Sequence, residues 1–167
     1  MNWNEYFFEM CKLVSQKSKD LHTKAGCVIV GPDNEVRSTG FNGFPRGVID
    51  SMAWGPFVNN MHSTERIIAE RSARPEKYIW TEHAERNAIY SAARTGIPLR
   101  NCTIYVTSMP CCDCARAIIQ SGIMNVYIEK YDKDYIEKNN DRYRFDAVQQ
   151  MFKEARVALF YAGEQLQ

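Results

Sequence analysis

The alternation of predicted helices and strands in the C-terminal half constrains the fold more than any other feature of this sequence. From residue 83 onwards, apolar side chains at helical spacing alternate with short runs rich in β-branched residues. Because a helix between two strands returns the chain to begin a parallel strand, this order predicts a mixed or mostly parallel sheet covered by helices on both faces. The helices are predicted at 83–94, 111–120 and 143–155, and the strands at 102–107, 125–129 and 157–161.

A helix and a β-hairpin are predicted before this alternating region. Residues 4–17 place apolar side chains at helical spacing, and the β-rich runs 25–30 and 35–41 flank a Gly-Pro-Asp-Asn turn. Together with the later strands they predict a central five-stranded mixed sheet in an α/β fold. Residues 50–81 follow neither pattern, and we interpret them as an insertion or long loop in which the charged stretch 64–77 is compatible with a helix.

The composition is that of an ordinary globular protein. Hydrophobic residues make up 45% and charged residues 25%, and we interpret residues 1–167 as one domain. The N-terminus lacks a basic lead-in and a small-residue cleavage site, and the apolar runs are far shorter than a membrane span of ~18 residues. We therefore expect a cytoplasmic protein (host cytoplasm if viral) without membrane contact. The net charge of +1 argues against a long nucleic acid as partner.

The six cysteines divide into two groups. Thiols stay reduced in the cytoplasm, so a disulfide framework is not expected. Three cysteines lie in apolar surroundings and are interpreted as small core residues: Cys11, Cys27 and Cys102. The others crowd into Pro110-Cys111-Cys112-Asp113-Cys114 at a predicted helix start. Their spacing of three places the sulfurs of Cys111 and Cys114 on one helical face, where they can bind a single metal ion.

A third metal ligand is predicted at the start of another helix. His83 is of a type that zinc commonly takes, and it brings the protein ligands to three. Structural zinc sites normally have four protein ligands, so three ligands and one open position are typical of a catalytic site. Glu85 is then predicted to move protons rather than to bind the metal. The alternative is a closed site with Cys112 as fourth ligand, which its direction, ~100° away from that of Cys111 on a helix, disfavours.

The combination His-x-Glu and Pro-Cys-x-x-Cys resembles the signature of the zinc-dependent deaminases. The resemblance implies hydrolysis at C4 of a cytosine, in which Glu85 protonates N3 and then delivers a proton to the departing amine. Neither an organic cofactor nor a nucleoside triphosphate is needed for this step. Two other interpretations stay open: a zinc deaminase acting on a nucleoside, a free base or tRNA adenosine, and a zinc fold without catalytic activity.

Longer matches narrow the resemblance to the deoxycytidylate deaminases, notably those of tailed bacteriophages. Four stretches carry it: 15–19, 40–47, 83–89 and 118–123. The family implies a three-layer α/β/α fold and the conversion of dCMP to dUMP, which supplies thymidylate synthesis. It also implies a homo-oligomer, typically a hexamer, that dCTP activates and dTTP inhibits, with Mg²⁺ as a companion of the triphosphate.

The family's roles can be carried over to matching positions of this sequence. The implied substrate-binding residues are Asn42, Ala84, Ser108 and Arg94, with Asn42 at the sugar. The implied effector-binding residues are Lys24, Asn42, Gly43, Phe44, Arg46 and Asp50. Glycines permit close approach of the backbone to a ligand, but this loop is also compatible with an ordinary glycine-proline turn. Arg94 is compatible with a phosphate or subunit contact, and equally with a cation near a helix C-terminus.

Two departures from the family pattern stand out. Some members hold a second, structural zinc with His and Cys residues of the insertion and the N-terminal region. Here the insertion offers only His62, and His22 lacks an obvious partner, so we predict one zinc per chain. Arg86 occupies a position where the family commonly has Leu, and the sequence gives no account of this change.

Overall fold

A mixed β-sheet forms the centre of the molecule. The computed structural model describes residues 1–20, 22–50, 61–161 and 164–166, and within them the strand order is β2-β1-β3-β4-β5-β6. Strands β3, β4 and β5 are parallel to one another, and the other neighbouring pairs are antiparallel. The strands are β1 Gly26–Val30, β2 Val36–Phe41, β3 Thr103–Ser108, β4 Asn125–Lys130, β5 Ala158–Tyr161 and β6 Glu164–Gln165. The predicted mixed sheet is confirmed, with the two-residue β6 as an addition.

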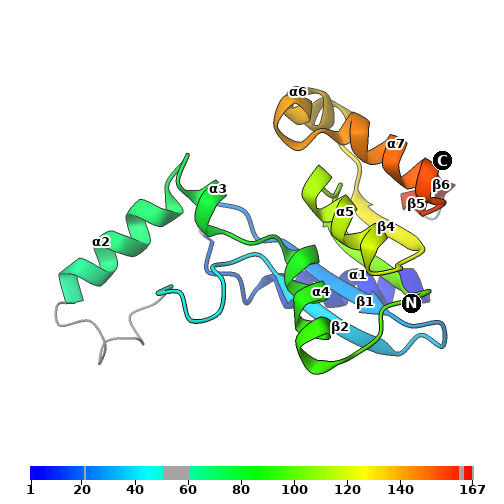
Figure 1. Ribbon diagram of the computed structural model, residues 1–167, viewed down its shortest axis with the longest axis horizontal. Coiled ribbons are helices and arrows are strands. Elements are labelled where there is room, and N and C mark those ends of the chain that lie inside the picture. The colour runs from blue at the N-terminus through cyan, green and yellow to red at the C-terminus, as the bar shows by residue number, and fades with distance from the viewer. Residues whose placement is uncertain (21, 51–60, 162–163, 167) are drawn as a thin grey trace.

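Helices lie on both faces of this sheet, as predicted. Figure 1 shows α4 and α5 on the near face and α1 on the far face, while α2 projects away from the sheet. The helices are α1 Trp3–Ser15, α2 Met61–Ser72, α3 Lys77–Trp80, α4 Ala84–Thr95, α5 Cys112–Gln120, α6 Lys133–Tyr143 and α7 Phe145–Ala155. No helix of the described residues is long and apolar enough to cross a membrane.

The core has one cluster on each face of the sheet, because successive side chains of a strand point to opposite faces. Cys27 and Ile29 of β1 pack with the apolar sides of α4, α5 and α7, whereas Val28 and Val30 pack with α1. The three cysteines interpreted as core residues are buried, which confirms that prediction.

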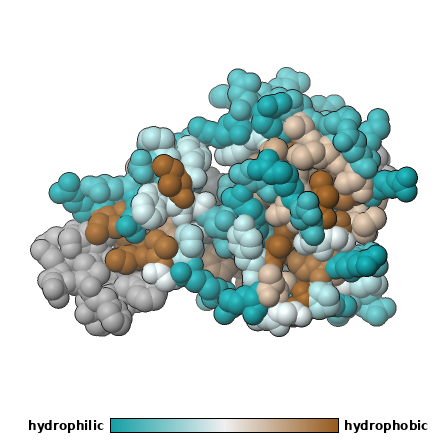
Figure 2. Space-filling view, in the orientation of Figure 1, coloured by the Kyte–Doolittle hydropathy of each residue, from teal (hydrophilic) through white to brown (hydrophobic). Residues whose placement is uncertain are grey.

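Two helical regions differ from the sequence interpretation. Helix α6 was not predicted, because none of its side chains is buried and it therefore carries no apolar stripe. Figure 2 shows a hydrophilic surface at the top of the molecule, where Figure 1 places α6. The insertion contains α2 and α3 rather than a long loop alone, so a helix does form in its charged stretch, and residues 51–60 lie outside the described residues.

Helix α4 packs against β2 with no side chain between them at one point. A Cβ atom on Gly40 would lie 2.2 Å from the carbonyl oxygen of Ala84 and 2.4 Å from the backbone nitrogen of Ala88. The Ser38 hydroxyl donates a hydrogen bond to the Ala88 carbonyl (2.7 Å), and the Asn87 amide donates to the Phe41 carbonyl (2.8 Å). Main-chain atoms therefore fix the position of α4, the helix that begins after His83.

A buried ion pair joins the insertion to the N-terminal region. The Lys77 ammonium of α3 pairs with the carboxylate of Asp20, and their side chains are only 11% and 8% exposed. The same carboxylate accepts hydrogen bonds from the backbone N–H groups of His22 and Thr23 and from the Asn42 amide. Because it holds three segments together, this pair is expected to contribute to stability.

We expect the substitution Lys77→Ala to lower the free energy of unfolding by about 3–5 kcal/mol, because it leaves a buried carboxylate without its cation. Urea unfolding of the variant and of the wild type measures this difference. Lys19→Ala is the matched control, since Lys19 is 54% exposed in its pair with Asp50 and such pairs contribute only about 0–1 kcal/mol. Equal losses in the two variants would contradict the prediction.

The effect of Lys77→Ala should also depend on pH. Burial raises the pKa of Asp20, but the hydrogen bonds from Lys77, His22 and Thr23 outweigh it and lower the pKa below its usual value. A carboxyl with a lowered folded-state pKa stabilises the fold above its unfolded pKa of about 3.9 and loses this contribution as the pH falls through the folded value. The difference between the two proteins should therefore shrink as the pH falls below about 4.

Candidate metal centre

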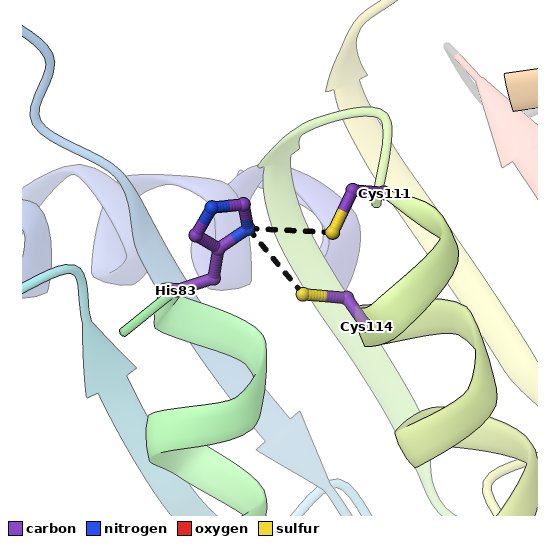
Figure 3. Close-up of side chains that lie close together, drawn as sticks. All are labelled: His83, Cys111 and Cys114. Atoms are coloured by element: carbon purple, nitrogen blue, oxygen red, sulfur yellow. Dashed lines mark hydrogen bonds between the residues drawn. The ribbon is translucent and has the colours of Figure 1, made fainter. Parts of the chain in front are cut away.

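The predicted metal ligands come together at the starts of two neighbouring helices. His83 is the N-cap residue of α4, and Cys111 is the N-cap residue of α5, which follows β3 after a short turn. The Nδ1 atom of His83 lies 3.5 Å from the sulfur of Cys111 and 3.5 Å from the sulfur of Cys114 (Figure 3). Among the described residues this is the one group of three His, Cys, Asp or Glu ligand atoms within 4.8 Å of one another.

The geometry and chemistry of this group fit a zinc ion. Ligands of a tetrahedral zinc, with Zn–S of ~2.3 Å and Zn–N of ~2.0–2.1 Å, lie roughly 3.5 Å apart, which matches both separations. Figure 3 shows the imidazole of His83 and both sulfurs directed toward a common point. Two sulfurs and one nitrogen are also the donors that zinc prefers over magnesium or calcium. Three ligands leave one coordination position for a reactant.

Three pKa shifts describe how the group shares its protons. The Cys114 thiol and the His83 ring hydrogen-bond to Cys111 and lower the pKa of its thiol to about 4. The hydrogen bond to Cys111 raises the pKa of His83 to about 9, and the same bond together with burial raises the pKa of Cys114. The shifts favour the thiolate at Cys111, and metal binding to the group releases protons because metal ligands bind in their deprotonated form.

Glu85 lies in the first turn of α4, beside the ligands but not among them. Its side chain is buried, and this burial raises the pKa of its carboxyl above the usual value. It stands two residues after the ligand His83, and the charges of His83 and Cys111 also act on this carboxyl. A buried carboxyl at this place can hold a proton and pass it to a group bound at the open coordination position.

Cys112 is not part of the metal group. Its thiol is half-buried and accepts a hydrogen bond from Arg116 (3.2 Å), and it does not join the cluster of His83, Cys111 and Cys114. The structure thus argues against the closed four-ligand site. His22 is exposed and His62 has a side chain outside the described residues, so one zinc per chain stays a prediction.

The structure gives an account of Arg86, which the sequence did not. Its guanidinium lies between the carboxylate of Glu82, just before α4, and that of Asp113 in α5 (3.2 Å). Glu82 also accepts a hydrogen bond from the backbone N–H of His83. Arg86 therefore links the two helices that carry the metal ligands, a role that leucine cannot take.

A groove of about 660 Å³ lies along α4, between this helix and the loop that follows β2. It is lined by four of the predicted effector residues, Gly43, Phe44, Arg46 and Asp50, and by Arg94. Gly43 forms two backbone hydrogen bonds with Glu82, which connects the groove to the residue before His83. His83, Cys111 and Cys114 do not line the groove, but Glu82, which directly precedes His83, does.

The other predicted binding residues have different surroundings. Lys24 is exposed and, like Asn42, does not line the groove. The buried Asn42 amide accepts from the Ala25 N–H (2.8 Å) and donates to the Thr23 carbonyl (2.8 Å), so most of its hydrogen-bonding capacity is used within the protein. Ala84 is buried at the start of α4, and Ser108 is exposed at the end of β3. Their contacts with a substrate stay predictions.

One aromatic residue beside the metal ligands was missed in the sequence. The ring of Tyr143 lies edge-to-face against the ring of His83, with centroids 6.4 Å apart. Tyr143 ends α6, a helix without an apolar stripe, so no pattern in the sequence pointed to it.

The α/β fold brings one histidine, two cysteines and a buried glutamate to the starts of two adjacent helices. This arrangement defines a metal-dependent hydrolytic enzyme. The family described as "cytidine and deoxycytidylate deaminase zinc-binding region" matches residues 1–130. The chain belongs to this cytidine and deoxycytidylate deaminase family, which confirms the resemblance.

Individual relatives agree with this assignment. An uncharacterized deaminase of Aliivibrio fischeri is 38% identical over 93% of this chain and 90% of its own length. The deoxycytidylate deaminase of enterobacteria phage T4 is 36% identical over 75% of this chain and 77% of its own length. The crystal structure of a dCMP deaminase from the cyanophage S-TIM5, in complex with dCMP and dUMP, has the same fold, with 21% identity, coverage of 94% of each chain and a TM-score of 0.66.

Proposed function

We propose that this protein hydrolyses the 4-amino group of dCMP and releases dUMP and ammonia. The observation that carries the proposal is the His83, Cys111 and Cys114 group with the buried carboxyl of Glu85 beside it. Several relatives are named deoxycytidylate deaminases, including that of phage T4, and they support dCMP as the substrate over a nucleoside, a free base or tRNA adenosine. A zinc deaminase acting on a nucleoside, a free base or tRNA adenosine is the alternative.

The protein's own residues perform three tasks in this reaction. His83, Cys111 and Cys114 would hold the zinc, which when bound lowers the pKa of water to about 7 and supplies a nucleophile at neutral pH. Glu85 protonates N3 of the cytosine, which makes C4 more electrophilic, and later delivers a proton to the departing amine. Arg86 keeps the two ligand-bearing helices in place through Glu82 and Asp113.

The groove beside α4 is proposed as a nucleotide effector site. Arg46, Arg94 and Lys19 line it and provide cations for phosphate groups, and Phe44 and Tyr90 provide aromatic faces for a base. Activation by dCTP, inhibition by dTTP and a Mg²⁺ ion with the triphosphate stay predictions from the family.

A homo-oligomer, typically a hexamer, is also proposed. The exposed side chains of Tyr90 and Phe41 support a contact surface beside the groove. A cytoplasmic location also stays a prediction.

Ultraviolet absorbance of zinc-loaded protein mixed with dCMP tests the function. We expect dCMP to be converted to dUMP, at a rate that dCTP raises and dTTP lowers. Conversion at a rate that neither triphosphate changes would support the deaminase activity and contradict the effector site. If dCMP stays intact with zinc confirmed in the protein, the proposed substrate is wrong, and cytidine, guanine and tRNA are the next substrates to measure.

A further inference from the structure

Two arginines converge on one tyrosine near the metal centre. The guanidinium of Arg142, in α6, lies 4.0 Å from the centre of the Tyr78 ring and donates a hydrogen bond to the Tyr78 hydroxyl. The guanidinium of Arg74, which precedes α3, lies 5.9 Å from the centre of the same ring. Both arginines are exposed, and within the part of the chain that the structure describes neither pairs with a carboxylate.

One of these cations, Arg142, is connected to the metal ligands through a neighbouring aromatic residue. The ring of Tyr143 contacts the ring of His83, and the Arg142 guanidinium lies 5.9 Å from the centre of that Tyr143 ring. Tyr143 therefore contacts a predicted zinc ligand on one side and has Arg142 as its neighbour in the sequence.

Arg94, the phosphate candidate from the sequence, is poorly placed for this role within one chain. It stands eleven positions after His83 along α4, which at 1.5 Å per residue is about 16 Å from the metal ligand. It lines the groove and ends the helix that begins at the metal centre. Within one chain, a substrate at the metal centre therefore needs another cation for its phosphate.

We propose that Arg142 and Arg74 bind the 5′-phosphate of a mononucleotide whose base is held at the metal centre. The inference rests on the proposed function, and it names the group by which the enzyme distinguishes a nucleotide from a nucleoside. An arginine fork matches a phosphate with two parallel hydrogen bonds, and stacking on Tyr78 fixes the plane of the Arg142 fork in advance. Since neither cation pairs with a carboxylate of the described residues, phosphate binding breaks no ion pair within that part of the chain.

Part of the site lies outside the family match. Arg142 and Tyr143 lie beyond residue 130, where that match ends, whereas Arg74 and Tyr78 lie within it, in the insertion. Helix α6 has no fully buried side chain, but Ile136 and Tyr143 pack against the core and hold its end near His83. This packing leaves the guanidinium of Arg142 exposed and free to bind a ligand.

Kinetics with two substrates test the proposal. The ratio of kcat/KM for dCMP to that for deoxycytidine is measured for the wild type, Arg142→Gln, Arg142→Lys and the double variant Arg74→Gln/Arg142→Gln. We expect the ratio to fall about tenfold or more in the double variant, through a higher KM for dCMP, because two charge-assisted contacts to phosphate are lost. Arg142→Lys keeps the charge without the fork and should lie between the wild type and Arg142→Gln.

Controls separate recognition of the phosphate from loss of structure. Arg66→Gln removes an exposed arginine of α2 that pairs with Glu70, and it should leave the ratio as in the wild type. Thermal unfolding of each variant shows whether α6 and α3 stay in place. An unchanged ratio in the double variant, or an equal fall in kcat/KM for both substrates, would overturn the proposal.

A binding measurement keeps this test independent of the proposed reaction. Calorimetric titration compares dUMP with deoxyuridine on the zinc-loaded protein. We expect tighter binding of dUMP, with the advantage lost in the double variant, even if the wild type deaminates neither dCMP nor deoxycytidine. Equal affinity of the wild type for the two ligands, or an advantage of dUMP that survives both substitutions, rejects the phosphate site whatever the turnover shows.

Discussion

Turnover of dCMP falls by roughly 10²–10⁴-fold when Glu85 is replaced by glutamine, while the protein keeps its zinc. The amide preserves the size of the side chain but can neither give up nor take a proton at the catalytic pH. Glu85 lies beside the ligand group and not within it, so the substitution leaves all three metal ligands in place. The measurement is kcat for dCMP together with the zinc content of the same preparation.

A matched control for this prediction is Glu82→Gln, which removes a carboxylate three residues before Glu85. Glu82 binds Arg86 and the N–H of His83, so its loss should affect zinc retention more than proton transfer. If Glu85→Gln instead removed the zinc along with the activity, Glu85 would be a ligand or its support, and its assigned role in proton transfer would be wrong.

Cys114→Ala should abolish both zinc binding and turnover, whereas Cys112→Ala should retain both. Cys114 is buried with its sulfur 3.5 Å from the Nδ1 atom of His83, and zinc with two remaining protein ligands is held far more weakly. Cys112 has the same side chain two positions away but contacts Arg116 instead. The two variants thus differ only in which thiol is lost from the same helix.

Zinc content after dialysis against a chelator, followed by turnover on re-addition of zinc, measures the effect of these two variants. The wild type and Cys112→Ala should recover activity with zinc, and Cys114→Ala should not. Loss of zinc from Cys112→Ala would contradict this prediction and support the interpretation of a closed site with four protein ligands.

The metal centre could be predicted from the sequence because its residues stand close together within two short segments. His83 with Glu85, and Cys111 with Cys114, are each a few residues apart at predicted helix starts, and the resemblance to the zinc deaminase signature joined the two segments into one site. The strands and the helices with an apolar stripe were likewise predictable, since periodicity reports directly which side chains face a core.

The parts that could not be predicted depend on contacts between distant segments. Arg86 had no interpretation until Asp113, from another helix, was found beside it. Helix α6 lacks an apolar stripe, so neither it nor the contact of Tyr143 with His83 left a pattern in the sequence. The ion pair of Lys77 with Asp20 joins residues 57 positions apart, and no local rule pairs them.

The contact between Gly40 and α4 has a consequence for how this protein can change during evolution. Side chains in most helix–sheet interfaces set the spacing between the two elements, so substitutions there shift the helix. Here the backbones meet directly, and the separation cannot change with side-chain size as long as residue 40 remains glycine. We therefore expect the position of His83 and Glu85 to tolerate apolar substitutions in the surrounding core better than any side chain at residue 40.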